Sequence, residues 1–167
     1  MVKLGKINDR NVEYIKVNDL SVLKGKLPKD NWILLAVADI EQTNKIHELS
    51  VICFDHYVRY VCGTGSGGTK IDDYFDEEYL IRLFRAGKEP IDENLDDMPM
   101  TVWSENFEEE FWFATCLANE ENIELNKVVC INLTDVDYEN EILYYTNNTP
   151  IDFPLRANHG NRVSSCF

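Results

Sequence analysis

The eight residues WILLAVAD, Trp32 to Asp39, form a continuous apolar run that ends in a carboxylate. A run of this length and composition predicts a strand buried on both faces, as in the middle of a parallel sheet. From Thr43 to about Phe54 apolar residues recur at helical spacing, which predicts a helix packed against that strand. A strand followed by a packed helix indicates an α/β fold.

Similar segments follow along the chain. Further strands are predicted at Tyr57–Cys62 (YVRYVC), Met100–Trp103 (MTVW) and Lys127–Leu133 (KVVCINL), with a fifth at Glu141–Thr146 (EILYYT). One helix is expected from Asp72 or Asp73 to Gly87, and another from Ser104 or Asn106 to about Asn119. This alternation predicts a mostly parallel sheet of four or five strands with helices on both faces.

A chain of 167 residues is long enough for one core and too short for two. We therefore expect a single three-layer α/β domain with the flavodoxin-like strand order 2-1-3-4, counted from the strand at 32–39. That order places a ligand crevice between the first and third strands, lined by residues 39–43 and 103–106. The core spans 32–146. Residues 1–31 form an adapter over a sheet edge with a short edge strand at 12–17, and 147–167 form an extended tail.

A glycine-rich turn, CGTGSGGTK, follows the second predicted strand. Gly63, Gly65 and Gly68 have the G-x-G-x-x-G spacing that lets backbone amides approach a pyrophosphate. Against this reading, residues 69–71 separate the turn from the predicted helix, and acidic residues from Asp72 onward repel phosphate. A structural turn is favoured. Nucleotide binding is the alternative, and its predicted residues are Asp39, Gly63, Gly65, Ser66, Gly68, Trp103 and Ser104.

The formal net charge is −14, and it is unevenly distributed. Between Asp72 and Glu141 there are 21 acidic and 4 basic residues. Such a field opposes nucleic acid and anionic membranes and speeds encounter with a cationic partner. The sequence therefore predicts a surface that docks on a basic protein, with aromatic anchors among the acids. Its predicted residues are Glu89, Asp92, Glu93, Asp96, Asp97, Glu105, Glu108, Glu109 and Trp112.

Other chemistry has little support in the sequence. The five cysteines lie far apart, without the close pairs of a zinc or redox site, which predicts reduced thiols in a cytoplasmic protein. No apolar run is long enough to span a membrane. A carboxylate-based, metal-dependent hydrolase using Asp39, Glu41 and Glu105 is a second alternative. No catalytic residue, resident metal or cofactor is predicted.

Four stretches carry a resemblance to known proteins. AVAD at 36–39, the Cys-Gly turn at 62–63, MTVWSE at 100–105 and EFWFATCLA at 110–118 resemble small bacterial Rossmann-like proteins. That resemblance implies a fold and no activity. In size and acidity the chain also resembles immunity proteins that neutralise secreted bacterial toxins, which implies a non-enzymatic inhibitor of a basic partner such as a nuclease toxin. Whether the apolar helix after Asn106 is covered by this chain or by a second copy in a homodimer stays open.

Overall fold

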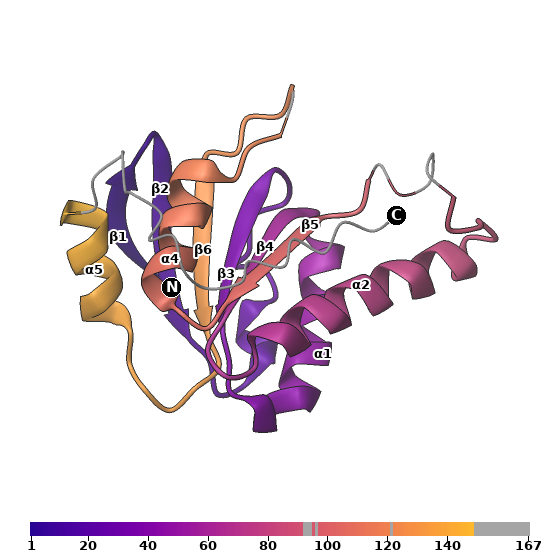
Figure 1. Ribbon diagram of the computed structural model, residues 1–167, viewed down its shortest axis with the longest axis horizontal. Coiled ribbons are helices and arrows are strands. Elements are labelled where there is room, and N and C mark those ends of the chain that lie inside the picture. The colour runs from indigo at the N-terminus through magenta and orange to yellow at the C-terminus, as the bar shows by residue number, and fades with distance from the viewer. Residues whose placement is uncertain (92–94, 96, 121, 149–167) are drawn as a thin grey trace.

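The computed structural model describes residues 1–91, 95, 97–120 and 122–148. It contains one six-stranded sheet with helices on both faces (Figure 1). The strands are β1 (Val2–Ile7), β2 (Arg10–Lys16), β3 (Trp32–Val37), β4 (Val58–Thr64), β5 (Met100–Ser104) and β6 (Lys127–Asn132). The helices are α1 (Thr43–Asp55), α2 (Gly68–Arg85), α4 (Phe107–Trp112) and α5 (Glu139–Asn148), with the π-helical segment η3 (Phe113–Leu117) and the 3₁₀ turns η1 (Leu20–Leu23) and η2 (Ile40–Gln42). The predicted tail from 149 onward lies outside the described residues.

The strand order is β1-β2-β6-β3-β4-β5. β1 is antiparallel to β2, and all other neighbours are parallel, so the expected mostly parallel α/β sheet is confirmed. The predicted order 2-1-3-4 is wrong because β6, not β5, pairs with β3. Burial explains the difference: β6 is buried along nearly its whole length and needs neighbours on both sides, whereas β5 is short and half-exposed and suits an edge.

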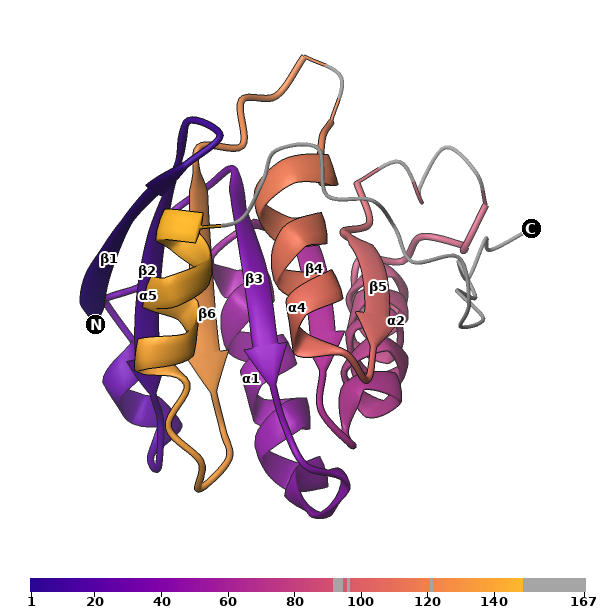
Figure 2. The ribbon, with the colours of Figure 1, turned by 60° about the vertical axis from the view of Figure 1, so that its left-hand side comes forward.

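Each face of the sheet has its own core. The face covered by α1 and α2 buries Trp32, Leu34 and Ile46 together with Ile71 and Phe75. The opposite face is covered by α4, η3 and α5 (Figure 2). Its core includes Ile33, Leu35, Phe111, Ala114 and Ile142. Residues of β3 alternate between the two cores, which is why its sequence is apolar throughout.

The predicted N-terminal adapter is part of the sheet. β1 and β2 form a hairpin through Asn8 and Asp9, which both have positive φ (45° and 63°), as a two-residue type I′ turn requires. β2 is an interior strand between β1 and β6, so the edge strand expected at 12–17 is not at the edge.

The predicted type of one element and the predicted start of another are also wrong. Residues 141–146, expected to be a strand, lie in α5, because Ile142 and Thr146 are buried four residues apart on one face of a helix. α2 begins at Gly68, inside the glycine turn, and not at Asp72 or Asp73. Residues 69–71 therefore do not separate the turn from the helix.

Candidate functional site

The carboxyl ends of β3 and β6 lie side by side where the chain diverges to opposite faces of the sheet. β3 leads into α1 on one face, and β6 leads toward α5 on the other (Figure 2). The side-chain amide of Gln42 donates to the carbonyl of Leu133 and joins the two loops. In open α/β sheets, ligands bind at such a switch point. The predicted crevice between residues 39–43 and 103–106 is wrong, because β4 separates β3 from β5.

Aromatic rings from α4, α5 and the loop after β6 meet beside this switch point. The ring centroid of Phe107 lies 5.1 Å from that of Tyr138 and 6.1 Å from that of Tyr145. Tyr145 also contacts Phe111, at 5.8 Å between centroids. The Tyr138 backbone is held from β2, because its amide donates to the hydroxyl of Tyr14. The rings are therefore fixed to the sheet and to each other.

Three carboxylates from different segments act electrostatically on the hydroxyls of Tyr138 and Tyr145. Burial raises the pKa of the Tyr138 hydroxyl, and the charges of Glu141 and Asp39 raise it further. The pKa of Tyr145 is raised by burial and then by Glu108 and Glu141. The pKa of Glu141 is itself raised, by burial and by the charge of Glu108. We name Asp39, Phe107, Glu108, Tyr138, Glu141 and Tyr145 the switch-point cluster.

The cluster belongs to a larger group of carboxylates at the carboxyl edge of the sheet. Its nine members are Asp39 and Glu41 after β3, Glu105, Glu108 and Glu109 after β5, and Asp135, Asp137, Glu139 and Glu141 after β6. Among the residues that the structure describes, none of these nine forms an ion pair. Nor does that part of the chain hold a group of His, Cys, Asp and Glu suited to a metal.

Exposed apolar side chains lie among these carboxylates. Ile40, Val136 and Tyr144 are 50%, 60% and 62% exposed. Ile40 follows Asp39, and Val136 precedes Asp137, so the two loops of the switch point each present an apolar residue beside a carboxylate. A surface that combines apolar anchors with one sign of charge is suited to a protein partner.

One protein-family model, described as Domain of unknown function (DUF7684), matches residues 11–149. The chain belongs to this family. No curated protein and no solved structure matches the chain. The matched range includes every residue of the switch-point cluster.

The predicted partner surface of this DUF7684 chain is divided in the structure. Glu105, Glu108 and Glu109 lie at the carboxyl edge, at the start of α4. Glu89 follows α2, and Asp97 contacts Arg59 near the start of β4, 3.9 Å between the charged atoms. Trp112 is only 6% exposed and is not available as a surface anchor. Asp92, Glu93 and Asp96 lie outside the described residues.

The alternative ligand residues lie near one another at the ends of β3, β4 and β5. Gly63 pairs with Trp103, and the hydroxyl of Ser66 accepts from the amide of Ile40 at 3.1 Å. Ser104 donates instead to Glu109, at 3.1 Å. The glycines serve this packing: a Cβ at Gly65, whose φ is +85°, would lie 2.5 Å from the carbonyl oxygen of Ala38.

Two other glycines are explained in the same way. The amide of Gly67 donates to the Ala38 carbonyl at 2.9 Å, so the turn is closed onto the chain's own backbone. A Cβ at Gly63 would lie 3.0 Å from the carbonyl oxygen of Gly68. The close approach of the turn to β3 and to itself accounts for Gly63 and Gly65, whereas a Cβ at Gly68 would make only ordinary contacts, 3.4 Å from the carbonyl oxygen of Gly63.

Two buried polar groups under α4 were not predicted. Glu110 is 5% exposed, and burial, with the nearby charge of Glu109, raises its pKa to about 8. Its Oε2 has no hydrogen-bond partner among the described residues, and the same holds for the buried hydroxyl of Thr64. Burial raises the pKa of the Cys62 thiol, and the charge of Glu110 adds to the shift; Cys62 shares the α4-facing side of β4 with Thr64. The available signal was that Glu110 lies beside Phe111 and four residues before Ala114, both in the core.

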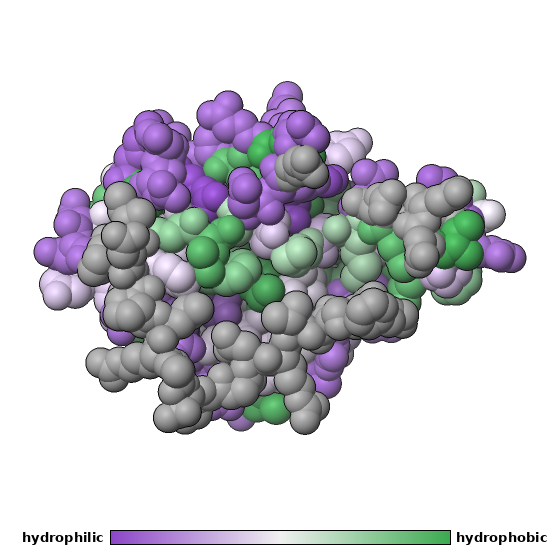
Figure 3. All heavy atoms as spheres, turned by 45° about the horizontal axis from the view of Figure 1, so that its top comes forward, coloured by the Kyte–Doolittle hydropathy of each residue, from purple (hydrophilic) through white to green (hydrophobic). Residues whose placement is uncertain are grey.

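A further group of exposed hydrophobic residues lies at the far end of α2. It includes Phe84 and Ile91. Figure 3 shows hydrophobic residues at this end of the molecule. Because Ile91 is followed directly by residues outside the described part, we assign this group no role. In the described part of the chain, no helix is both long and apolar enough to cross a bilayer.

Proposed function

We propose that this DUF7684 chain is a non-enzymatic binding protein whose carboxyl edge docks on a basic protein. The observation that supports this function is the group of nine carboxylates, unpaired within the described residues, around exposed Ile40, Val136 and Tyr144. Hydrogen bonds from Glu139 and Tyr14, and the charge of Lys16, lower the pKa of Asp137. The acids still outnumber the cations at this edge, and a cationic partner relieves the repulsion among them. A basic toxin such as a nuclease is the class of partner that we propose.

Two variants of equal net charge test the role of the edge. The edge variant carries Glu41→Gln, Glu105→Gln and Asp135→Asn. The control variant carries Glu48→Gln, Glu77→Gln and Glu124→Gln, which lie on α1, on α2 and in the loop before β6. All six side chains are exposed and outside the ion pairs of the described residues. A general effect of net charge changes both variants alike, whereas a docking edge changes only the first.

Affinity capture from cells of the source organism with wild type and both variants as baits provides the partner. We expect a basic protein to be recovered by the wild type and the control variant, with a reduced yield for the edge variant. Stopped-flow association of that protein should slow roughly three- to tenfold for the edge variant and fall steeply with added salt. Recovery of no basic protein, or equal association rates for the two variants at low salt, would contradict the proposed function.

A further inference from the structure

We propose that the free edge of β5, together with Asp72 and Asp76 on α2, binds an extended basic segment of a partner protein as an additional strand. This inference rests on the proposed docking of a basic protein and names the element of that protein that is recognised. In the described part of the chain, β5 is the last strand of the sheet and pairs only with β4. Backbone amides and carbonyls on its outer side are therefore available to another strand.

The two edges of the sheet differ in how they are protected. The opposite edge, β1, carries Lys3 and Lys6, and its pairing with β2 is irregular between Lys3 and Gly5. Helix α5 also packs on it, since a Cβ at Gly5 would lie 3.0 Å from the Cγ2 of Thr146. Lysines, bulges and a covering helix all discourage the addition of a strand. β5 (MTVWS) carries no charge and no proline, and its pairing with β4 is regular, so β5 is the edge that can accept one.

Asp72 and Asp76 lie beside this edge on one row of α2. Gly68, Asp72 and Asp76 follow at intervals of four residues, which places them on the same face of the helix. Gly68 faces Trp103, because a Cβ at Gly68 would lie 3.7 Å from the Trp103 Cβ. Asp76 accepts from the hydroxyl of Thr101 at 3.4 Å. Asp72 is therefore directed toward β5 between Trp103 and Thr101, at the side of the molecule where α2 and β5 lie together (Figure 2).

This pair of carboxylates lacks a cation. Asp72 is 9% exposed, and its Oδ1 has no hydrogen-bond partner among the described residues. Neither Asp72 nor Asp76 forms an ion pair in that part of the chain. A buried carboxylate without a partner is unfavourable, and a cation placed beside it removes much of that cost.

A strand added to β5 can supply the cation. Side chains directly opposite each other on neighbouring strands have Cβ atoms about 5 Å apart. A lysine or arginine on the α2 side of the added strand therefore lies next to Thr101 or Trp103, within reach of the two carboxylates. Main-chain hydrogen bonds to β5 hold the segment, and the carboxylates select a basic side chain at every second position.

A second copy of this chain is a poor occupant of the same edge. Two β5 strands paired by a two-fold axis would bring two Asp72–Asp76 pairs to one face of the joined sheet. Like charges opposed in this way repel one another. A basic segment has the complementary charge, so a partner protein is favoured over a homodimer.

The test adds heptapeptides, acetylated and amidated, to the full chain and follows its backbone amides by NMR. The lysine peptide is TVTKTVT, in which valine and lysine alternate with threonine. The norleucine peptide replaces its lysine by norleucine, and the methylated peptide carries N-methyl groups on the lysine and the threonine before it, which removes a donor from each edge of the strand. We expect the lysine peptide to shift the amides of Thr101, Val102 and Trp103 and to bind about fivefold tighter than the norleucine peptide. The methylated peptide should bind at least about tenfold more weakly.

Variants of α2 test the two carboxylates. Asp72→Asn with Asp76→Asn should bind the lysine and norleucine peptides equally. Asp73→Asn with Glu77→Gln removes the same charge from exposed positions of α2 and should change the preference for lysine less than about twofold. Asp76→Asn alone removes an unpaired carboxylate without unfolding the chain, so a reduced lysine preference in this variant is an effect on binding and not on stability.

Three outcomes would overturn the inference. Equal binding of the lysine and norleucine peptides to the wild type rejects the role of the carboxylates, and equal binding of the methylated peptide rejects strand addition. Slow hydrogen exchange of every amide from Thr101 to Trp103 in the free chain would show that the edge is already paired. A concentration-dependent dimer that shifts the same amides without peptide would assign the edge to a second copy.

Failure of this inference is distinguishable from failure of the proposed function. If the lysine peptide does not bind at β5 but the edge variant with Glu41→Gln, Glu105→Gln and Asp135→Asn loses the basic partner, the β5 site is wrong and the proposed function stands. If the lysine peptide binds at β5 and depends on Asp72 and Asp76 while that edge variant keeps its partner, docking through the carboxyl edge is wrong and the β5 site stands.

Discussion

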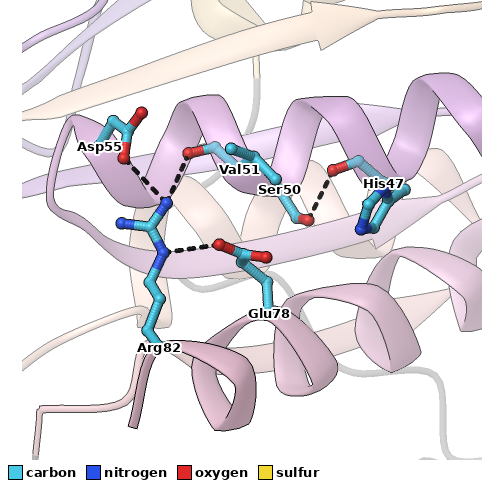
Figure 4. Close-up of polar contacts among 6 residues, drawn as sticks. All are labelled: His47, Ser50, Val51, Asp55, Glu78 and Arg82. Carbon is cyan, nitrogen blue, oxygen red and sulfur yellow. Dashed lines mark hydrogen bonds and ion pairs between the residues drawn. The ribbon is translucent and has the colours of Figure 1, made fainter. Parts of the chain in front are cut away.

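Two clusters of buried polar groups, one on each face of the sheet, differ in whether their polar atoms have hydrogen-bond partners. On the α1–α2 side, Arg82 donates to Glu78 at 2.7 Å, to Asp55 at 2.8 Å and to the carbonyl of Val51 at 3.1 Å (Figure 4). On the α4–α5 side, Glu110 and Thr64 are buried with polar atoms that have no partner among the described residues. The difference indicates that the contacts of Arg82 stabilise the fold, whereas buried Glu110 and Thr64 reduce its stability.

The largest expected effect comes from neutralising one buried acid on each side. The raised pKa of Glu110, about 8 against 4.5, means that the folded state favours the protonated acid. The stabilisation that protonated Glu110 gives the folded state is complete below pH 4.5 and is lost as the pH rises to about 8. Glu110→Gln should remove this loss and raise the free energy of unfolding at pH 9 by on the order of 3 kcal/mol.

Glu78→Gln is the matched substitution on the other side. Glu78 is almost fully buried, with 3% of its side chain exposed, and is paired with Arg82, so losing its charge should destabilise the protein by about 1 kcal/mol. Urea unfolding of wild type and both variants from pH 5 to pH 9 measures the two effects. A Glu110→Gln profile parallel to that of the wild type, or the same sign for both substitutions at pH 9, would show that the two buried acids do not differ in their effect on stability.

Removing the positive charge of Arg82, which joins Glu78 on α2 to Asp55 on α1, gives the next largest effect. Arg82→Met keeps an apolar stem beside Phe54 but leaves the buried Glu78 carboxylate without its partner. Since about a third of the Arg82 side chain is exposed, solvent reduces the penalty, and we expect a loss of about 2 kcal/mol. Arg85→Met, one turn later on an exposed position, is the control and should change stability by less than about 0.5 kcal/mol. Equal losses would show that the network does not stabilise the fold.

Local patterns predicted most elements of the fold but not their order. The runs at 32–37, 58–64 and 127–132 are apolar enough to specify strands on their own. Order depends on the face to which each helix returns, and adjacent residues carry little information about that. The stronger apolar character of Lys127–Leu133 compared with Met100–Trp103 was the signal that the former is interior. In Glu141–Thr146 the buried Ile142 and Thr146 show a helical period that the β-branched and aromatic composition concealed.

The candidate site was predictable only in part for the same reason. Charge pointed to Glu105, Glu108 and Glu109, and the end of the central strand pointed to Asp39. Their meeting with Glu141 depends on α5 being a helix and on β6 lying next to β3. A wrong strand order therefore displaced the predicted crevice, although some of its residues were correct.

Helix α2 also carries a partly buried carboxylate, Asp76, that forms no ion pair among the described residues. Burial raises the pKa of Asp76 to about 6, and the charge of Asp72 adds to the shift, while a 3.4 Å hydrogen bond from Thr101 opposes it. The stabilisation that protonated Asp76 gives the folded state is complete below pH 3.8 and is lost as the pH rises to about 6. Asp76→Asn should therefore stabilise the protein at pH 7, by about 1 kcal/mol after allowance for solvent.

The control for this prediction is Asp73→Asn, one turn of the chain away on an exposed position. Its carboxylate is paired with Lys70 at 2.9 Å and is the last of the causes that raise the pKa of Asp76, so neutralising it should stabilise the protein much less than Asp76→Asn does. Thermal unfolding at pH 7 and pH 4 compares both variants with wild type. A gain at pH 4 as large as that at pH 7 would show that charge at Asp76 is not the cause.

The smallest effect isolates a single hydroxyl on the α4 side. Thr64 and Thr115 are both fully buried, but Thr115 donates to the Phe111 carbonyl at 2.7 Å, whereas the Thr64 hydroxyl has no partner among the described residues. Valine keeps the branched shape and removes only the hydroxyl, so Thr115→Val should cost about 1 kcal/mol and Thr64→Val should be neutral or stabilise by up to about 1 kcal/mol. Chemical denaturation at pH 7 is sufficient to resolve the two. If Thr64→Val costs as much as Thr115→Val, the Thr64 hydroxyl has a hydrogen-bond partner, such as a buried water shared with Glu110, and it does not reduce the stability of the fold.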